Sequence, residues 1–292
     1  MELDFFLGEN HMMGAIIGDI CGSIYEFDNR KTERPETIEL INPECFYTDD
    51  TVLTVAVAEA AFGDKDYEKA ILKWARAYPK ESYGYNFRSW FLSKYPKPYN
   101  SYGNGSAMRV SPIGWAFTTI EETLKEAKKS AACTHNHKEG FKGAQATAAA
   151  IFLAGSGKTK EEIKTYIEKE YGYNLNRSLA EIRPLYKFNE TCQKTVPEAI
   201  IAFLESKDFT HAIQCAISIG GDTDTLAAIT GGIAEAFYSR DEKHFRTYSG
   251  IPEKLVEFAD SKMNTDMKAV IRKFYHEKMK MEVVKIATEY SL

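Results

Sequence analysis

Two short acidic clusters, far apart in the chain, constrain the fold more than any other feature of the sequence. Residues 48–51 read TDDT and residues 220–225 read GGDTDT, and each cluster runs directly into an apolar, alanine-rich segment. Neighbouring side chains on a regular element point in different directions, so Asp49 and Asp50 can share a site only at the end of an element. The clusters therefore predict the starts of two buried helices. If folding brings these starts together, four carboxylates and several hydroxyls meet in one place.

Carboxylates this close repel one another unless a positive charge lies between them. Oxygen ligands alone suit hard cations such as Mg²⁺ or Mn²⁺, and four carboxylates are enough for two metals that share a substrate. The alternative for each cluster is an ordinary helix cap, because Thr and Asp at a helix start satisfy free backbone amides and complement the helix dipole. The glycine pair before Asp222 permits a tight turn that a plain cap does not need. The repeated pattern favours a metal-dependent hydrolase.

The composition is that of an ordinary globular protein and excludes several classes. The 292 residues include 37 basic and 42 acidic ones, for a net charge of −5, which argues against a nucleic-acid surface. No apolar run approaches the roughly 20 residues of a membrane span, and the acidic start lacks the basic region of a secretory signal. The five cysteines are scattered without CxxC spacing, as is typical of reduced thiols. We therefore expect a cytoplasmic protein.

Helical periodicity dominates the chain, and no sustained alternation of apolar and polar residues predicts a strand. We expect an all-α fold, with residues 14–292 forming one domain around a central helical bundle and residues 1–13 as an N-terminal extension. Residues 28–43 and 95–102, rich in charge, proline and asparagine, are expected to be long surface loops. Helices are expected over residues 51–62, 121–132, 140–154, 197–207, 211–219, 226–238, 252–262 and 266–287.

A polar turn between the two clusters indicates a second binding element. Residues 101–110 read SYGNGSAMRV and lead into a helix. Bare amides at a helix start can hold a phosphate, and the adjacent Tyr102 can stack on a base. The alternative is a plain loop before a capped helix, since Gly, Asn and Ser are the usual turn residues.

Three further patterns allow more than one interpretation. Residues 134–137 (THNH) lack the spacing and the cysteine pair of a zinc site, so we expect a single histidine of this run to face a phosphate, or else to have an exposed capping role. Residues 155–159 (GSGKT) lack the first glycine of a P-loop, and Thr159 with Glu162 predicts a capping box instead. Glu26, close after a tight helix end, is either a gating or acid–base group of a pocket or a solvated surface acid.

Taken together, these segments resemble the ADP-ribosyl hydrolase (ADP-ribosylglycohydrolase) family, whose motifs they match in order. The resemblance extends from residue 14 to about residue 238. It rests on residues 14–23 with Glu26, 48–51, 103–109, 134–135 and 220–225. The family implies an all-α fold with two Mg²⁺ (or Mn²⁺) ions at the base of a cleft.

The resemblance also implies roles for individual residues. The turn at residues 101–105 would wrap the pyrophosphate and distal ribose of ADP-ribose, with Tyr102 against the adenosine end and His135 near a phosphate. Glu26 would match the gating glutamate of the family. The implied substrate-binding residues of the turn are Ser101, Tyr102, Gly103, Asn104 and Gly105, and the implied metal ligands are Thr48, Asp49, Asp50, Asp222, Asp224 and Thr225.

The implied reaction is hydrolysis of the glycosidic bond at the terminal ribose of an ADP-ribosylated protein or small molecule. The metals would hold the ribose hydroxyls and polarise a water. Carboxylates of the clusters (Asp50, Asp222 and Asp224), with Glu26 nearby, would take and return protons.

One departure from the family pattern bears on the linkage. Members that release ADP-ribose from arginine, such as dinitrogenase reductase glycohydrolase, have an aspartate three residues before the asparagine of the Gly-Asn-Gly turn, suited to pairing with a guanidinium. Here that position is Ser101, and the run SYGNG is closer to the eukaryotic serine-linkage branch. We therefore favour an O-glycosidic linkage, as in serine adducts or O-acetyl-ADP-ribose, with the arginine linkage as the alternative.

Two other classes stay open at this point. The family includes crystallin-like members, so a non-catalytic ADP-ribose-binding relative is one alternative, because a fold does not guarantee an activity. A metal phosphoesterase that cleaves the pyrophosphate and yields AMP is the other. The presence of all six implied ligand positions favours an enzyme over the non-catalytic relative, and the identity of the product distinguishes the phosphoesterase.

Overall fold

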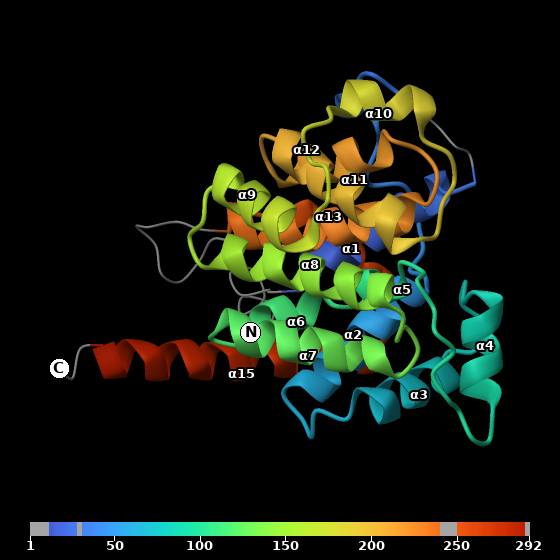
Figure 1. Cartoon of the computed structure of the whole chain (residues 1–292), viewed down its shortest axis with the longest axis vertical. Coiled ribbons are helices and arrows are strands. Elements are labelled where there is room, and N and C mark those ends of the chain that lie inside the picture. Colours follow the sequence, from blue (N-terminus) through green and yellow to red (C-terminus); the bar gives the residue numbers. More distant parts are fainter. Residues whose placement is uncertain (1–11, 28–30, 240–249, 290–292) are drawn as a thin grey trace.

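The computed structural model describes residues 12–27, 31–239 and 250–289, and the regular elements of this part of the chain are helices (Figure 1). Within it there is no strand, and the extended pairing is limited to one isolated bridge between Gly103 and Thr191. The expected all-α fold is therefore confirmed. The expected N-terminal extension falls almost entirely outside the described residues.

The helices follow one another with short connections. Within the described ranges they are α1 (Met13–Gly22), α2 (Asp49–Ala61), α3 (Tyr67–Ala77), α4 (Tyr85–Leu92), α5 (Gly105–Met108), α6 (Ser111–Ala116), α7 (Ile120–Ala132), α8 (Lys138–Gly155), α9 (Lys160–Tyr171), α10 (Leu179–Leu185), α11 (Cys192–Glu205), α12 (Phe209–Ile217), α13 (Thr223–Tyr238), α14 (Glu253–Lys262) and α15 (Thr265–Glu289), with 3-10 turns at Ser23–Tyr25 and Pro35–Thr37. No helix of the described part is both long and apolar enough to cross a membrane.

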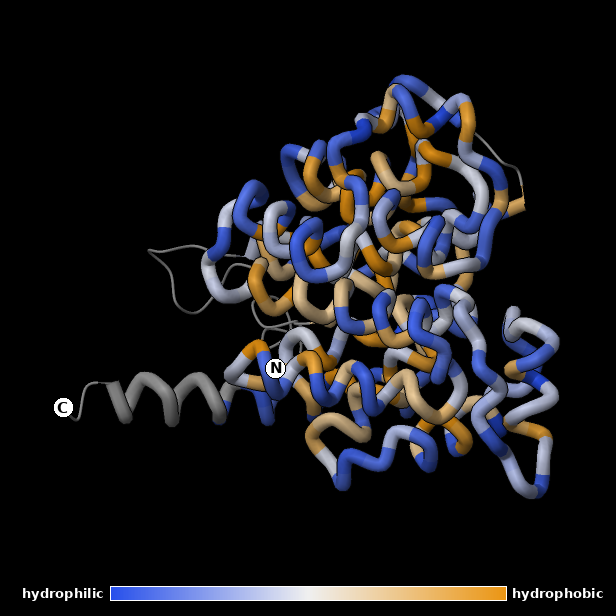
Figure 2. Tube along the Cα trace, in the orientation of Figure 1, coloured by the Kyte–Doolittle hydropathy of each residue, from blue (hydrophilic) through white to orange (hydrophobic). Residues whose placement is uncertain are grey.

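Helix α13 forms the centre of the fold. It packs against α1, α8, α11 and α12, and all of its residues from the start to Ala236 are buried. Hydrophobic residues follow these inner helices, whereas hydrophilic residues gather on the outer turns (Figure 2). Such complete burial explains why the segment after the second acidic cluster is alanine-rich and has no polar face.

Helix α1 lies directly against α13 because small residues face each other along the contact. A Cβ atom added at Gly18 would lie 2.0 Å from the carbonyl oxygen of Ala227, so the two backbones touch there. Glu235 of α13 is fully buried and accepts hydrogen bonds from the amides of Met13 (3.3 Å) and Gly14 (2.8 Å) at the start of α1. The pair is thus fixed at both ends, which sets the position of the acids that α1 and α13 carry.

Most of the expected helices occur, but their ends differ by a few residues. Helix α2 begins at Asp49, before the expected start at residue 51, because the Thr48 hydroxyl accepts from the Asp50 amide and caps the helix. Helix α11 begins at Cys192, where residue 197 was expected, because a tertiary bond from the Cys192 amide to the Tyr102 carbonyl (3.0 Å) fixes its first turn.

Two further expectations differ in outcome. The capping box at Thr159 is confirmed, and it opens α9. In the described part of the expected surface loop at residues 28–43, Ile38 and Leu40 are buried in the core. That segment therefore packs against the body of the protein, and its expected exposure is wrong for these two residues.

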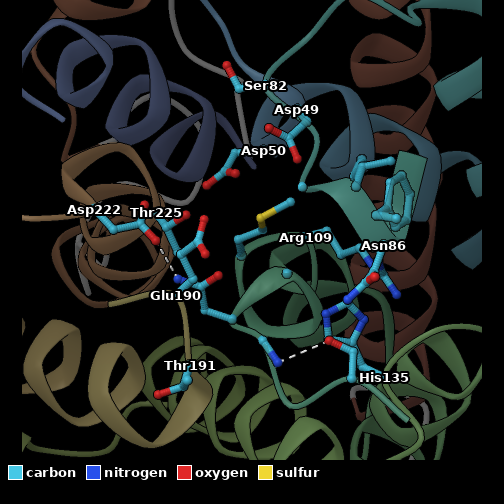
Figure 3. A pocket seen from close by; sticks show the side chains of 18 of the residues that line it. Asp49, Asp50, Ser82, Asn86, Arg109, His135, Glu190, Thr191, Asp222 and Thr225 are labelled. Atoms are coloured by element: carbon cyan, nitrogen blue, oxygen red, sulfur yellow. Dashed lines mark hydrogen bonds between the residues drawn. The ribbon is translucent and has the colours of Figure 1, made fainter. Parts of the chain in front are cut away.

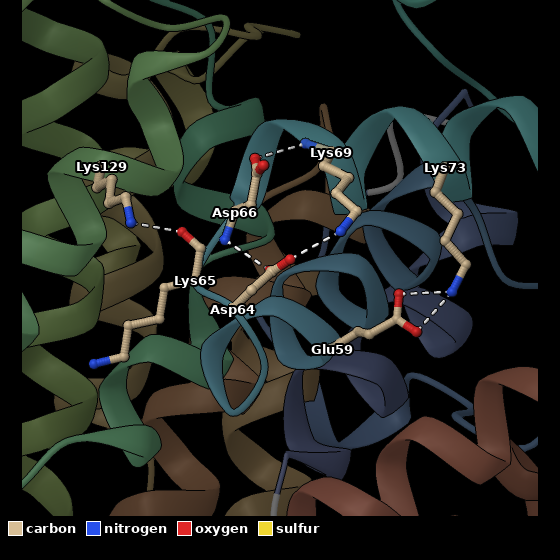
Figure 4. Close-up of polar contacts among 7 residues, drawn as sticks. All are labelled: Glu59, Asp64, Lys65, Asp66, Lys69, Lys73 and Lys129. Carbon is tan, nitrogen blue, oxygen red and sulfur yellow. Dashed lines mark hydrogen bonds and ion pairs between the residues drawn. The ribbon is translucent and has the colours of Figure 1, made fainter.

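The outer end of α2 and the start of α3 carry a network of surface charges (Figure 4). Lys69 pairs with Asp64 at 2.9 Å, and Lys73 pairs with Glu59 at 2.7 Å. Asp66 caps α3 by accepting from the Lys69 amide at 3.1 Å. Each of these acids has a lysine or a backbone amide of the chain as its partner.

Candidate functional site

The starts of α2 and α13 meet at a cleft of about 580 Å³. Asp50, Asp222 and Thr225 lie on one side of it, and Asn86, Arg109 and His135 lie on the opposite side (Figure 3). The cleft contains nearly every site residue expected from the sequence: Glu26, Asp49, Asp50, Ser101, Tyr102, Gly103, Asn104, Gly105, His135, Asp222, Asp224 and Thr225. Thr48 does not line it.

Asp19 of α1 organises the start of α2. Its carboxylate accepts from the amides of Thr48 (3.0 Å) and Thr51 (3.1 Å) and from the hydroxyls of both threonines. Burial raises the pKa of Asp19, although the hydrogen bonds from the two threonines oppose this. The position of α2 is thus set by α1, and this is what turns Asp49 and Asp50 toward the cleft.

Thr48 stands behind the first turn of α2. Its hydroxyl donates to Asp19 Oδ1 at 2.7 Å and accepts from the Asp50 amide at 3.2 Å. A hydroxyl oxygen has two acceptor positions, so one remains after these bonds. The expected role of Thr48 as a metal ligand stays a prediction.

The two acids of α2 lack positive partners. Asp50 is buried, and its Oδ2 has no hydrogen-bond partner among the described residues. Burial, followed by the charges of Asp19 and Asp49, raises the pKa of Asp50 well above its usual value. Burial and the charge of Asp19 likewise raise the pKa of Asp49 to about 8. Both carboxylates are therefore destabilised as anions unless a cation joins them.

The second cluster is built on a glycine turn. Gly220 and Gly221 have φ values of 75° and 78°, a left-handed backbone that glycine adopts without strain. This turn reverses the chain into α13, whose first residues bring Asp222 and Asp224 to the cleft. The side-chain amide of Asn104 donates to Asp222 Oδ2 at 2.6 Å, and the backbone amide of Thr225 donates to Asp224 Oδ1 at 2.8 Å. One oxygen of each carboxylate is thereby oriented.

Glu26 joins the two aspartates of α13. One carboxylate oxygen from each of Glu26, Asp222 and Asp224 lies within 4.8 Å of the other two. Burial, followed by the charge of Asp222, raises the pKa of Glu26 to about 7. The interpretation of Glu26 as a solvated surface acid therefore does not hold, because it is partly buried and faces the acidic cluster.

The donor set of this acidic base fits divalent cations. The carboxylates of Glu26, Asp49, Asp50, Asp222 and Asp224 have no ion pair with a lysine or arginine of the described residues. Buried carboxylates without a positive partner are costly. Oxygen-only ligands suit Mg²⁺ or Mn²⁺.

The other side of the cleft is formed by the polar turn. The Ser101 hydroxyl accepts from the Gly103 amide at 3.1 Å, and the Asn104 amide donates to the Glu190 carbonyl at 2.7 Å. Tyr102 is half exposed, with its ring centroid 5.4 Å from that of His137. The turn is thus held by hydrogen bonds, while one aromatic face stays accessible.

His135 lies beside this turn and is buried. Burial lowers the pKa of His135 well below its usual value, and the nearby positive charge of Arg109 lowers it further. The imidazole is therefore neutral at physiological pH. His137, the second histidine of the pair, caps α8 by accepting from the Glu139 amide at 3.1 Å, so the two histidines have separate roles.

Sequence reasoning missed several residues of the cleft. Helix α4 and the preceding loop contribute a wall with Ser82, Tyr85, Asn86 and Phe87, and Glu190 lies beside the polar turn. No motif marks these residues, because α4 is short and aromatic and comes to the cleft only through tertiary packing. Arg109 gave a weak signal, as the lone charge in the run SAMRVSP.

A cluster of buried acids and an amide-rich turn thus face each other across one cleft of an all-α protein. The sequence profile of the ADP-ribosylglycohydrolase family matches residues 9–280. The chain belongs to this family. The resemblance found in the sequence is confirmed, and the family places the chain among the ADP-ribosyl hydrolases.

Individual relatives agree with this assignment. ADP-ribosylhydrolase ARH3 of Homo sapiens is 26% identical over 337 residues, covering 88% of this chain and 90% of the relative. ADP-ribosylarginine hydrolase Tri1 of Pseudomonas putida is 24% identical, covering 84% and 72%. A solved structure described as an ADP-ribosylglycohydrolase-related protein complex matches with a TM-score of 0.68 at 24% identity, covering 91% and 96%. The last match shows the shared fold.

Proposed function

We propose that the chain, acting through one domain over residues 14–292, hydrolyses the glycosidic bond at the terminal ribose of ADP-ribosylated proteins or small molecules. The observation that carries this proposal is the convergence of five carboxylates from three separate segments on one cleft. One of them, Asp50, is buried with an oxygen that has no partner among the described residues. Family membership supplies the class of reaction.

The residues that would hold two divalent cations, Mg²⁺ or Mn²⁺, are Thr48, Asp49, Asp50, Asp222, Asp224 and Thr225. When bound, such ions supply Lewis-acid polarisation of their oxygen ligands. The donor set supports hard cations but does not distinguish the two metals.

The side chains of the cleft would have separate roles in the reaction. Glu26, one carboxylate oxygen of which lies within 4.8 Å of oxygens of Asp222 and Asp224, is placed to take and return a proton. The Asn104 side chain holds Asp222 in place. Positive charge that develops on the ribose in the transition state would be stabilised by the acidic base of the cleft.

The binding side of the cleft suits the rest of ADP-ribose. The backbone amides of Gly103 and Asn104 are taken up by the Ser101 hydroxyl and the Glu190 carbonyl, so the Gly105 amide and the neutral imidazole of His135 would be the hydrogen-bond donors for the pyrophosphate. The half-exposed ring of Tyr102 offers a stacking face for adenine. The acceptor of the ADP-ribose would then lie toward the acidic base.

For the linkage, we favour an O-glycosidic bond, because Ser101 stands where an arginine-specific site needs an aspartate. The similarity to ADP-ribosylhydrolase ARH3 over most of both chains is compatible with this preference. The similarity to an ADP-ribosylarginine hydrolase keeps the arginine linkage as the second candidate.

The test is a product assay on purified protein. Serine-linked and arginine-linked ADP-ribosyl peptides are incubated with Mg²⁺ or with EDTA, and free ADP-ribose and AMP are quantified. Metal-dependent release of ADP-ribose from the serine peptide alone supports the full proposal. Release from the arginine peptide alone keeps the hydrolase but replaces the O-glycosidic linkage with the arginine linkage. AMP as the product, or tight binding of ADP-ribose without turnover of either peptide or of O-acetyl-ADP-ribose, overturns the proposed reaction.

A further inference from the structure

Arg109 is a buried cation next to the cleft. It follows α5, is fully buried, and forms no ion pair with a carboxylate of the described residues. Its Nη2 donates to the Ser130 carbonyl (3.1 Å) and to the Thr134 hydroxyl (2.9 Å), whereas Nε and Nη1 have no partner in the described part. A guanidinium stays charged under all ordinary conditions, and burying it without an anion is unfavourable. This position therefore favours an anion in the cleft that Arg109 lines.

The bond from Arg109 determines how Thr134 meets His135. Thr134 Oγ1 lies 2.7 Å from His135 Nδ1. Because Arg109 can only donate, the Thr134 oxygen accepts from it, and the hydroxyl hydrogen is free to donate to Nδ1. A proton on Nδ1 would instead leave the hydroxyl hydrogen with the thiol sulfur of Cys133 as its acceptor, and sulfur accepts a hydrogen bond only weakly. The chain of bonds thus places the imidazole proton on Nε2.

His135 Nε2 lies at the polar turn. A Cβ atom added at Gly105 would lie 3.1 Å from His135 Nε2, and one added at Gly103 would lie 3.5 Å from it. The two glycines thus lie against the Nε2 edge of the imidazole, and His135 lines the cleft together with them. The positive charge of Arg109 and burial both lower the pKa of His135, which agrees with a neutral ring that has one N–H.

We propose that Arg109 and Thr134 are positioning residues that hold His135 as the neutral Nε2–H tautomer, so that this N–H donates to the pyrophosphate of the ligand. The ligand part of this inference rests on the proposed function. The tautomer part rests on the apoprotein alone. Arg109 additionally supplies positive charge behind the turn, where an anionic group would sit.

The tautomer is measured directly by ¹H–¹⁵N correlation of the histidine side chains in the ligand-free protein, with His135→Gln used to assign the signal. The expected result is an unprotonated Nδ1 and a protonated Nε2 at neutral pH. A ring protonated on Nδ1, or a charged imidazolium, overturns the proposal that Arg109 and Thr134 hold His135 as the Nε2–H tautomer. If the protein does not bind ADP-ribose, the proposed function is contradicted. The spectrum still tests the tautomer of His135, because it is recorded without ligand.

A matched pair of variants separates positioning from packing. Thr134→Val keeps the shape but removes the hydroxyl, and Thr134→Ser keeps the hydroxyl. We expect Thr134→Val to lose the fixed Nε2–H signature and to weaken ADP-ribose binding about tenfold, whereas Thr134→Ser stays within about twofold of the wild type. Equal behaviour of the two variants in the spectrum would overturn the proposal, whatever their stability.

Arg109→Met tests the charge. Removing the guanidinium is expected to raise the pKa of His135, because a nearby positive charge disfavours the imidazolium. The same histidine signals, recorded across a pH titration, measure this pKa. An unchanged titration of His135 in a folded Arg109→Met protein would show that Arg109 does not position His135. If this variant does not fold, the Thr134 pair decides.

Discussion

The two ends of α2 both carry clustered carboxylates, yet the clusters are stabilised in opposite ways. At the outer end, hydrogen bonding to Lys69 lowers the pKa of Asp64 (Figure 4). Burial alone would raise the pKa of Glu59, but hydrogen bonds from Lys73 and Trp74 outweigh it and lower the value. At the cleft end (Figure 3), burial and neighbouring acids raise the pKa of Asp50 well above normal.

The difference shows what distinguishes a site from a solvated acidic surface. The outer acids Glu59 and Asp64 have lysines of the chain as partners, whereas the neighbours of the cleft acids include other acids. The outer cluster is complete without a ligand. The cleft acids have no lysine or arginine partner among the described residues, and such an arrangement suits the divalent cations proposed above.

The largest expected effect comes from removing one cleft carboxylate. Asp224→Asn keeps the size of the side chain but removes a charge, and should reduce turnover by roughly a thousandfold while the circular dichroism spectrum is unchanged. Asp64→Asn is the same chemical change in the outer cluster and should leave turnover unaffected. Near-normal turnover in Asp224→Asn would refute the proposed role of the acidic base.

Metal binding should stabilise the protein through the cleft alone. At a Mg²⁺ concentration about 100 times its dissociation constant, thermal unfolding should show a stabilisation of about 2.7 kcal/mol relative to EDTA. Asp50→Asn should lose most of this shift and Asp64→Asn should retain it. An equal shift in both variants would mean that the ion binds elsewhere, and the comparison between the two ends would fail.

Glu235 is a third case, a fully buried acid whose partners are backbone amides, and it sharpens the comparison. Burial raises its pKa from 4.5 to about 8, against the bond from the Gly14 amide. Between these two pH values the unfolded chain ionises at this position while the folded protein stays protonated, so stability falls as pH rises. The contribution is complete below pH 4.5 and lost above about 8.

Glu235→Gln removes this titration. Its denaturation free energy, measured by urea unfolding in EDTA from pH 5 to 8, should fall less steeply with pH than that of the wild type, with turnover preserved. Parallel pH profiles for the two proteins would show that Glu235 is ionised throughout.

The smallest effect is expected at the outer cluster. Lys73→Met removes the partner of Glu59, which is partly exposed, and solvent screening limits the loss of stability to less than about 1 kcal/mol. Salt should reduce the loss further. A loss of several kcal/mol, or any loss of turnover, would show that the outer cluster does more than stabilise the surface.

Much of the fold and of the site could be predicted from local sequence. The alanine-rich runs after residues 51 and 225 predicted buried helices, and the capping box at Thr159 predicted the start of α9. Nearly every residue that the acidic clusters and the polar turn supplied as a site candidate lines the cleft. These signals are local, because helix starts, caps and tight turns are determined by a few neighbouring residues.

Other features required the tertiary structure. The aromatic wall from α4 and the position of Glu190 depend on packing between distant segments, and no local pattern encodes them. Similarly, Asp19 and Arg109 are charged residues whose burial follows from how α1 and the turn after α5 pack.

The sequence by itself therefore determined the helical class, the two helix starts that carry paired carboxylates and the polar turn. Only the tertiary structure decided which carboxylates lose their partners, how Asp19 orients α2, and how Arg109 and Thr134 reach His135. The reason is that desolvation and charge coupling act through space, so the chemistry of each side chain depends on neighbours that are remote in the chain.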